Sequence, residues 1–385
     1  MKRKCKSVDV TARELAAQAV LLCLKPAKKR RRHDTIRLFA SVLRVTREEA
    51  RQALLDRDER YYKACETLAD MLQFSIMTGN LKLERPKEVR RKDACSGKVR
   101  CVAVLGIWHL LLDHVAVLGL SDLFRSVGEY QVSSIPGRGA AYGDKAMRRW
   151  LAEAAGKKLY SVKLDVKNFY GSVDQARLCA WLEKRVANKK LMWLIRSLLS
   201  VVDEGMAIGS FLSQTLANIY LSSLYHRAKE GYSRQRRGKR VATFRHALFY
   251  MDDMLLLGTS KRAMSQGVAD LIGFAQGELG LTIKPTWCVR EITARHPADL
   301  MGFRYGGGKV TLRRRIYKYA RRMMLRASRH GRVSAAAARR IASYKGYIER
   351  TASNPKGINA ASVYGMAARA TSYNHDRKNN VYKSA

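Results

Sequence analysis

The chain has 385 residues, 47% of them hydrophobic, and 74 Lys and Arg against 32 Asp and Glu give it a formal net charge of +42. The apolar content supplies a sizeable core, which excludes disorder of the whole chain, and the length allows two or three domains. Because such a charge opposes compaction of the protein alone, we expect a polyanionic partner. Nucleic acid is favoured over a membrane surface, since the charge is spread along the chain.

Seven cysteines are scattered along the chain without a C-x-x-C pair. An odd number of isolated cysteines indicates reduced thiols in a cytoplasmic protein, not a zinc ribbon or a disulfide framework. The apolar run at 16–24 is separated from the basic start by charged residues, and no small-residue cleavage site follows it. This pattern argues against a signal peptide.

Residues 1–90 are rich in Ala, Leu, Glu and Arg with little Gly, which predicts a helical N-terminal extension. The basic block Lys28–Arg32 interrupts this region, and it is either a solvated loop or a contact with a nucleic-acid backbone. A Gly turn within Cys95–Cys101 leads into a β-prone run at Val99–Leu105.

The longest apolar stretch of the chain is Val102–Leu120. It contains His109, Asp113 and His114, and these three groups would be costly to place in lipid. The stretch is therefore predicted to be a buried helix, and no membrane association is expected.

From about residue 159 onwards, strands and helices are predicted to alternate. The segment Lys158–Val166 alternates apolar and polar residues as a strand does, and helices are expected at Leu178–Leu199 and Phe211–Tyr225. The second of these helices carries almost no charge and should be buried. The apolar runs 244–250 and 254–257 are separated by a Met-Asp-Asp sequence, which predicts a hairpin with carboxylates near its turn.

The segment 309–385 is again expected to be helical and is very basic, with 19 Lys and Arg and only Glu349 and Asp376 as acids. Composition therefore divides the chain into an extension at 1–90, a central region at 91–308 and a basic tail at 309–385.

Carboxylates stand at the ends of apolar strands, which is unusual in a chain this basic. Asp165 ends one predicted strand, and Asp252 and Asp253 lie in the predicted hairpin. A buried carboxylate needs a cation, and Mg²⁺ prefers oxygen ligands. Two such strands side by side would hold a metal pair that activates a 3′-hydroxyl and stabilises a leaving pyrophosphate. Alternatively, Asp252 and Asp253 cap the turn or pair with Arg245.

Five motifs stand in order along the chain: Leu164–Tyr170, Ile208–Gln214, Tyr250–Asp253, Leu281–Lys284 and Leu300–Arg304. In this order and spacing they resemble the palm motifs of reverse transcriptases, over roughly residues 91–349. The resemblance implies an α+β right-hand polymerase fold, with fingers, a palm containing an antiparallel sheet and a helical thumb, here preceded by the helical N-terminal extension. It also implies an RNA-directed DNA polymerase, a nucleotidyltransferase that uses dNTPs to copy template RNA into a cDNA–RNA hybrid.

The resemblance implies a catalytic role for four side chains. Asp165 and Asp252 would be the principal ligands of two Mg²⁺ ions, for which Mn²⁺ is a possible substitute. Asp253 would be a supporting carboxylate, and the backbone carbonyl of Val166 would complete the shell. Lys284 matches a lysine that protonates the leaving pyrophosphate, with a surface lysine as the alternative.

Other residues would bind the nucleotide. Tyr170 matches the steric gate that collides with a ribose 2′-hydroxyl, and an ordinary core tyrosine is the alternative. Lys98 and Arg100 fall where the fingers contact the triphosphate, and Arg100 is preferred because a guanidinium fits phosphate oxygens bidentately.

A loop-to-helix element is expected beneath the template and the incoming nucleotide. It contains Ile208, Gly209 and the pair Ser213 and Gln214. Gly permits close backbone approach, and Ser and Gln can hydrogen-bond the template. Alternatively, the element is a plain helix N-terminus capped by Ser210 or Ser213.

Three further segments resemble parts of the family. The Gly-Arg-Gly turn of Ser134–Gly139 either grips a phosphate or is a plain turn. Met301–Arg304 resembles the primer grip, a turn that packs on the primer backbone. The basic tail resembles the thumb that clamps the template–primer duplex, which predicts strongly salt-dependent activity.

The motif Ile-Gly-x-x-x-Ser-Gln begins with Ile208, where most of the family has Gln. This variant resembles the bacterial and phage-encoded reverse transcriptases of diversity-generating retroelements, whose error-prone cDNA rewrites a variable gene by mutagenic retrohoming. It implies a structured template RNA and a small basic oligomeric accessory protein as partners. Replacing Gln by Ile removes a polar check on the geometry of the nascent base pair.

Several alternatives stay open. Residues 1–90 exceed what a bare catalytic core needs, so an antiphage-defence reverse transcriptase is one alternative. A catalytically silent RNA-binding scaffold is opposed by the three carboxylates, and an RNA-dependent RNA polymerase is opposed by Tyr170. A group II intron maturase is disfavoured because its zinc-binding cysteines are absent from the sequence.

Overall fold

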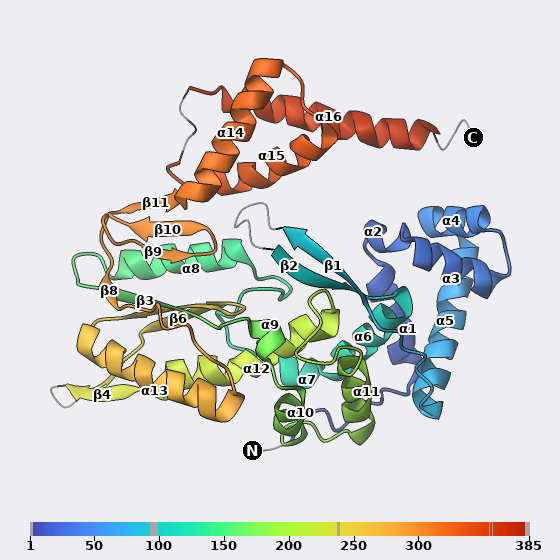
Figure 1. The fold of residues 1–385 in the computed structure, drawn as a ribbon, viewed down its shortest axis with the longest axis horizontal. Coiled ribbons are helices and arrows are strands. Elements are labelled where there is room, and N and C mark those ends of the chain that lie inside the picture. The colour runs from blue at the N-terminus through green and yellow to red at the C-terminus, as the bar shows by residue number, and fades with distance from the viewer. Residues whose placement is uncertain (1–2, 93–98, 237–238, 354, 356, 382–385) are drawn as a thin grey trace.

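A computed structural model describes residues 3–92, 99–236, 239–353, 355 and 357–381. Figure 1 shows three regions: helices of the N-terminal extension on the right, a central region built on a sheet, and a helical C-terminal region above it. Within the described residues, no helix combines the length and the apolar character needed to cross a membrane. The six cysteines of the described part are free thiols.

The N-terminal extension is helical, as predicted. Its α1 packs against α5 and against the first helix of the central region, α6. Two of these helices begin with a side-chain cap: Thr46 forms a reciprocal capping box with Glu49 at the start of α4, and Asp58 accepts the Tyr61 N–H at the start of α5. The elements are α1 (Arg13–Leu24), α2 (Ala27–Arg30), α3 (His33–Leu43), α4 (Arg47–Asp56), α5 (Glu59–Thr78) and α6 (Ile107–Gly119).

The basic block Lys28–Arg32 is partly structural. Arg30 donates hydrogen bonds to the carbonyls of Leu24 and Leu54, at 2.8 and 3.0 Å. Arg32 donates to the Leu105 carbonyl at 2.7 Å and pairs with a carboxylate of α3. These two arginines therefore tie the extension together and to the central region, and they do not form a free solvated loop.

The stretch Val102–Leu120 is not one helix. Its first three residues belong to β2 (Val99–Val104), which pairs with β1 (Lys87–Lys92) in antiparallel register. Helix α6 begins only at Ile107, whose N–H donates to Asp34 at 2.8 Å. The helix is buried, as predicted, but its start is set by strand pairing and by this distant carboxylate. The turn expected within Cys95–Cys101 lies mostly outside the described residues.

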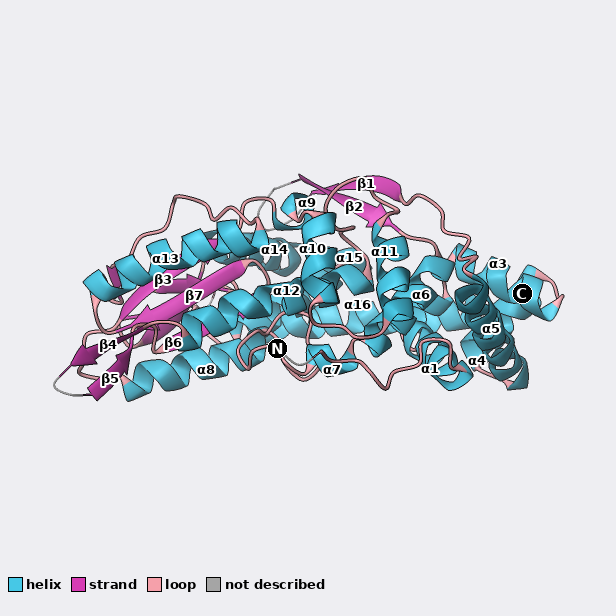
Figure 2. Ribbon diagram, turned by 90° about the horizontal axis from the view of Figure 1, so that it is seen from below, coloured by secondary structure: helices cyan, strands magenta, loops and turns pink. Residues whose placement is uncertain are grey.

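The central sheet has the strand order β6–β7–β3–β8, and every neighbouring pair is antiparallel. The expected strand and hairpin are confirmed by β3 (Tyr160–Asp165), β6 (His246–Tyr250) and β7 (Asp253–Gly258); β8 is Arg290–Glu291. Successive residues of a strand point to opposite faces, so the sheet has two apolar sides. Figure 2 shows its strands beside α12 and α13.

One face of the sheet packs on α12 (Phe211–Glu230) and α13 (Lys261–Leu279). The other face packs on α8 (Ala140–Glu153) and on a second sheet. Strands of the second sheet are β9 (Ala298–Leu300), β10 (Phe303–Gly306) and β11 (Lys309–Leu312). Small elements complete the region: α7 (Ser121–Phe124), α9 (Phe169–Ser172), β4 (Ser233–Arg236) and β5 (Lys239–Ala242).

The helix predicted at Leu178–Leu199 is two helices, α10 (Gln175–Glu183) and α11 (Lys189–Leu199). At the break, a distant segment contacts the connection, because Lys4 forms a bridge with Val186. Asn188 then starts α11 by accepting the Leu191 N–H at 2.8 Å.

The basic tail is helical apart from its first residues, which form β11 in place of the predicted helix. The expected division at 308/309 thus lies in the β10–β11 turn, and the division at 90/91 lies within β1. Three helices follow β11: α14 (Arg314–His330), α15 (Ala335–Ile348) and α16 (Ala360–Val381). Figure 1 shows them gathered above the second sheet.

Candidate active site

Three carboxylates separated by almost ninety residues in the chain come together at one end of the central sheet. Asp165, the last residue of β3, is the direct partner of Asp253, the first residue of β7. Asp253 also pairs with Tyr250, so Met251 and Asp252 form the two-residue turn between β6 and β7. Met251 has a φ of +56°, in the left-handed region that such tight turns use. The hairpin thus places Asp252 beside the cross-strand pair.

Burial raises the pKa of Asp252, and the like charges of Asp165 and Asp253 raise it further. The guanidinium of Arg100 opposes this shift. The three carboxylates therefore form a cluster in which negative charge is costly unless a cation enters it.

Asp253 has two cationic neighbours. Burial raises its pKa, and Lys163 and Arg313 counteract that effect. The Nζ of Lys163 lies 2.8 Å from Asp253 Oδ1, and Nη2 of Arg313 lies 3.9 Å from Oδ2. These two cations, and not Arg245, form the ion pairs of Asp253 within the described residues. Sequence reasoning missed both: the signal for Lys163 is its place two residues before Asp165, on the same face of β3.

Lys284 contacts Asp165 twice. Its side chain donates to Asp165 Oδ1 at 2.5 Å, and its backbone N–H donates to the Asp165 carbonyl at 2.9 Å. The neighbouring Val166 bridges to Ile283, and its N–H lies 3.4 Å from the carbonyl of Asp252. The motif around Lys284 is therefore an edge segment that brings its ammonium group against the carboxylates.

The donor atoms here suit a hard divalent cation. They are carboxylate oxygens with a backbone carbonyl nearby, which are the ligands that Mg²⁺ prefers. As placed, no three His, Cys, Asp or Glu side chains of the described residues converge closely enough to hold an ion. The ammonium and guanidinium groups already balance the carboxylates, and Nζ of Lys163 lies within hydrogen-bond distance of Oδ1 of Asp253. The residues fit a metal by the chemistry of their oxygen donors.

Two open cavities meet at this cluster. A palm–thumb cavity of about 760 Å³ lies between the sheet and α14–α15, and a palm–fingers cavity of about 920 Å³ extends towards β1–β2. Four residues predicted for the site line both cavities: Arg100, Tyr170, Ile208 and Asp252. Gly209, Gln214 and Asp253 line only the first, whereas Val166 and Lys284 line only the second.

Tyr170 is partly buried beside the carboxylates. Burial raises the pKa of its hydroxyl, and the charge of Asp252 adds to the shift. Its ring packs edge-on against Phe169, with 5.4 Å between centroids. Arg100, on β2, is exposed across the palm–fingers cavity, and Lys98 lies outside the described residues.

Gly209 lines the palm–thumb cavity and also lies against β2. Its φ is +121°, and a Cβ there would lie 2.6 Å from the Ala103 carbonyl of β2. The preceding Ile208 carbonyl accepts the Ala103 N–H at 2.8 Å. Ser210 then caps α12 by accepting the Ser213 N–H at 3.0 Å, as the alternative interpretation expected. This segment is therefore fastened to β2, the strand that carries Arg100.

The turn at Ser134–Gly139 uses its arginine internally. Nη1 of Arg138 donates to the carbonyls of Gly128 and Gln131, at 2.6 and 3.2 Å. The guanidinium expected to grip a phosphate is thus engaged with the backbone, and the plain-turn interpretation fits better. The expected primer-grip turn does line the palm–thumb cavity, through Met301 and Gly302.

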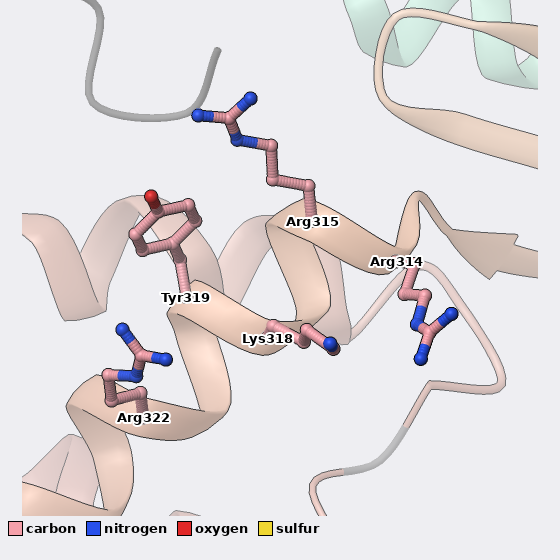
Figure 3. Close-up of a pocket in the computed structure, with 5 residues that line it drawn as sticks. All are labelled: Arg314, Arg315, Lys318, Tyr319 and Arg322. Atoms are coloured by element: carbon pink, nitrogen blue, oxygen red, sulfur yellow. The ribbon is translucent and has the colours of Figure 1, made fainter. Parts of the chain in front are cut away.

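Basic residues continue from the palm–thumb cavity along α14. Arg340 lines both that cavity and a neighbouring one of about 410 Å³ between α14 and α15. The second cavity shares Tyr319 and Arg322 with a surface pocket of about 510 Å³ on α14. Figure 3 shows this pocket, where Arg315 and Tyr319 extend to the same side of the helix. The path presents cations and an aromatic ring, as a phosphate-backbone contact requires.

Comparisons with known proteins agree with this arrangement. A family model described as "Reverse transcriptase (RNA-dependent DNA polymerase)" matches residues 87–305, more than half of the chain. The match, together with the sheet and helices described above, confirms the expected α+β right-hand polymerase fold. A search of curated proteins found no match.

Three solved telomerase structures are similar to the chain. Apo telomerase of Candida tropicalis, truncated from its C-terminal domain, aligns with 12% identity and a TM-score of 0.43, over 71% of this chain and 73% of that one. Telomerase of the same organism in complex with a fragment of telomeric RNA aligns with 12% identity and a TM-score of 0.44, over 72% of this chain and 59% of that one. The corresponding complex from Candida albicans aligns with 14% identity and a TM-score of 0.39, over 72% of this chain and 60% of that one. The chain thus spans about three fifths of the telomerase chains in the two complexes.

Proposed function

The chain belongs to the reverse transcriptase family, and from this premise we propose that it is an active RNA-directed DNA polymerase. The proposal depends above all on the register that pairs Asp165 with Asp253 and sets Asp252 in the turn beside them. This register brings the three carboxylates that nucleotidyl transfer needs to one end of the sheet, where Asp252 lines both open cavities and Asp253 lines one of them. A scaffold that only binds RNA would have no need to gather three carboxylates at one end of a sheet in a chain this basic.

In this proposal, Asp165 and Asp252 hold two divalent ions, with Asp253 and the carbonyl of Val166 in support. When bound there, Mg²⁺ would supply activation of the primer 3′-hydroxyl and charge neutralisation at the leaving pyrophosphate. Lys284 delivers a proton to the pyrophosphate, which is consistent with its position between Asp165 and the palm–fingers cavity.

The remaining site residues orient the substrates. Arg100 binds the triphosphate of the incoming dNTP, and the ring of Tyr170 excludes a ribose 2′-hydroxyl. Ile208 and Gly209 face the nascent base pair, and Gln214 contacts the template. All five line the cavities around Asp252. The basic path on α14 and α15 holds the template–primer duplex through its phosphates.

Primer extension tests the proposal. The protein, a template RNA with a DNA primer, dNTPs and Mg²⁺ should give metal-dependent extension, and Asp252→Asn should abolish it. Absence of extension on every RNA template tried, the cognate one included, would favour the silent scaffold. A preference for NTPs over dNTPs would indicate an RNA-dependent RNA polymerase.

We further propose the error-prone enzyme of a diversity-generating retroelement. Support comes from Ile208, an apolar side chain at the junction of both cavities where most of the family has Gln. An Ile cannot hydrogen-bond the nascent pair, so it permits mispairing opposite template adenine. Ile208→Gln should lower the error rate at template adenines, and an unchanged rate would refute this assignment.

The same proposal includes a structured template RNA and a small basic oligomeric accessory protein as partners. The alternative is an antiphage-defence reverse transcriptase, which the helical extension α1–α5 favours because a bare catalytic core does not need it. A template repeat and a matching variable repeat beside the gene would support the retroelement, and their absence would support the defence enzyme.

A further inference from the structure

Asp113, on α6, is a carboxylate that neither the metal site nor the nucleotide site uses. It is fully buried, with 0% of its surface exposed. Its Oδ2 accepts two hydrogen bonds from the start of α12, from the Ser210 hydroxyl at 2.8 Å and from the Phe211 N–H at 2.9 Å. The N-terminus of a helix favours negative charge, so α12 balances much of this buried carboxylate.

The other oxygen of Asp113 is less well satisfied. Oδ1 accepts no hydrogen bond within the described residues and lies 3.3 Å from Nε2 of His109, one turn earlier on α6. His114, one residue after Asp113, packs its ring against Phe211 with 4.5 Å between centroids. Helix α6 therefore holds the first turn of α12 through two hydrogen bonds and a ring contact.

The segment that Asp113 holds is the one beside the nascent base pair. Ser210, which donates to Asp113, directly follows Ile208 and Gly209. On its other side, the Ile208 carbonyl accepts the Ala103 N–H of β2. The segment 208–210 is thus clamped between α6 and β2, and moving either contact would move the lining of both cavities.

We propose that Asp113 is a positioning residue for nucleotide selection. Its carboxylate holds the Ile208–Gly209 segment against β2, and this contact sets both the affinity for the incoming dNTP and the discrimination against a mismatched one. Asp113 touches neither substrate nor metal. The inference deepens the proposed polymerase function and rests on it.

Three variants separate this role from a general loss of folding. Asp113→Asn keeps the shape but removes the charge, and Ser210→Ala removes one of the two hydrogen bonds and the helix cap. Ser210→Thr restores a hydroxyl with capping ability and should act as the rescue variant. Losing one charge-assisted hydrogen bond corresponds to roughly a tenfold effect. We expect the KM for dNTP to rise by about that factor in Asp113→Asn, with a smaller rise in Ser210→Ala.

The dissociation constant of the template–primer duplex should stay unchanged in all three variants, because the basic path on α14 is untouched. Asp144→Asn is the matched control. Asp144 is also a buried carboxylate, and it accepts hydrogen bonds from Tyr305 at 3.1 Å and Arg148 at 3.0 Å. It lines neither cavity, so its substitution should lower the melting temperature and leave the KM for dNTP as it is.

Two results would overturn the inference. The first is that the wild type extends primers and Asp113→Asn has the same KM for dNTP and the same mismatch rate as the wild type. The other comes from hydrogen exchange without substrates, where the amides of residues 211–214 should lose protection in Asp113→Asn; equal protection refutes the clamp even if no polymerase activity is found. A wild type that keeps the clamp but extends no primer refutes only the proposed function.

Discussion

Lys284 is joined to Asp165 by two hydrogen bonds, one from its side chain and one from its backbone. The backbone bond fixes the position of the residue, and the side-chain bond places an ammonium group against a carboxylate. A lysine held in this way is not an ordinary surface lysine, because both of its ends are restrained at the site.

Lys284→Ala should lower kcat for primer extension by roughly 10²–10³-fold, the range of a lost general acid. Lys284→Arg keeps the charge, yet it should stay well below the wild type because a guanidinium does not release its proton. Lys167→Ala is the control, since Lys167 is exposed and lies on the same strand end. Equal single-turnover rates for Lys284→Ala and Lys167→Ala would show that Lys284 transfers no proton.

Gly209→Ala should disturb the contact between the loop and β2. The added Cβ would lie 2.6 Å from the Ala103 carbonyl, and a φ of +121° is strained for any other residue. Such strain costs about 1–3 kcal/mol, and the displaced loop should also raise the KM for dNTP. Gly156→Ala has a positive φ of +73° with no atom near the added Cβ, so it measures backbone strain alone. Thermal unfolding measures the stability of both variants, and dNTP titration measures their KM. Equal changes in the two variants would contradict a special role of the contact between Gly209 and β2.

Salt dependence tests the basic path on α14. The affinity for a template–primer duplex should fall steeply with salt, and each phosphate contact removed should lower the slope of log affinity against log salt by about one. Arg315→Ala and Arg322→Ala are expected to do so, because both residues line the pocket of Figure 3. Arg51→Ala removes a partly exposed cation of α4 that pairs with Glu48, and it should leave the slope unchanged. Similar slopes of log affinity against log salt for all three variants would show that α14 does not contact the phosphates of the duplex.

The stability of the fold should depend on pH through His246. Its ring stacks on Trp150 with 4.3 Å between centroids. Burial, together with Lys229, Arg245 and Arg149, lowers its pKa to about 4. The unfolded chain takes up this proton near the ordinary pKa of about 6.5. Between these values the unfolded state binds more protons, so stability should fall as the pH drops through the window.

His246→Phe keeps an aromatic ring on Trp150 and removes the titration. Its melting temperature should fall less between pH 6.5 and pH 4 than that of the wild type, when both are followed by circular dichroism. Carboxylates titrate in the same range, but they are common to the two proteins. If the melting temperatures of the wild type and His246→Phe fall by the same amount between pH 6.5 and pH 4, His246 titrates normally in the folded state.

The strands of the site could be predicted because each has a local signal. Alternating apolar residues end at Asp165, and two short apolar runs flank Asp252 and Asp253; both patterns depend on neighbours in the chain alone. The break in the predicted helix at Leu178–Leu199 had one local signal, the N-cap Asn188, whereas the bridge of the connection to Lys4 joins residues far apart in the sequence and has no local signal.

Side-chain partners were harder to predict than elements. Arg138 has the local signature of a phosphate contact, but its Nη1 donates to the backbone carbonyls of Gly128 and Gln131. In the sequence, Arg313 is one of several cations in a basic run, and only the β10–β11 hairpin brings it to Asp253. Ion pairs of this kind depend on register and loop paths, and composition carries no information about either.

Arg313 stands where the second sheet passes into α14. Its side chain pairs with Asp299 of β9 and reaches towards Asp253, and its backbone N–H donates to Gly302 at 2.9 Å. A tilt of α14 about its first turn would therefore move this guanidinium, and with it one of the two positive charges beside Asp253. Under the proposed function, a substitution that shifts α14 should change the catalytic rate as well as the affinity for the duplex.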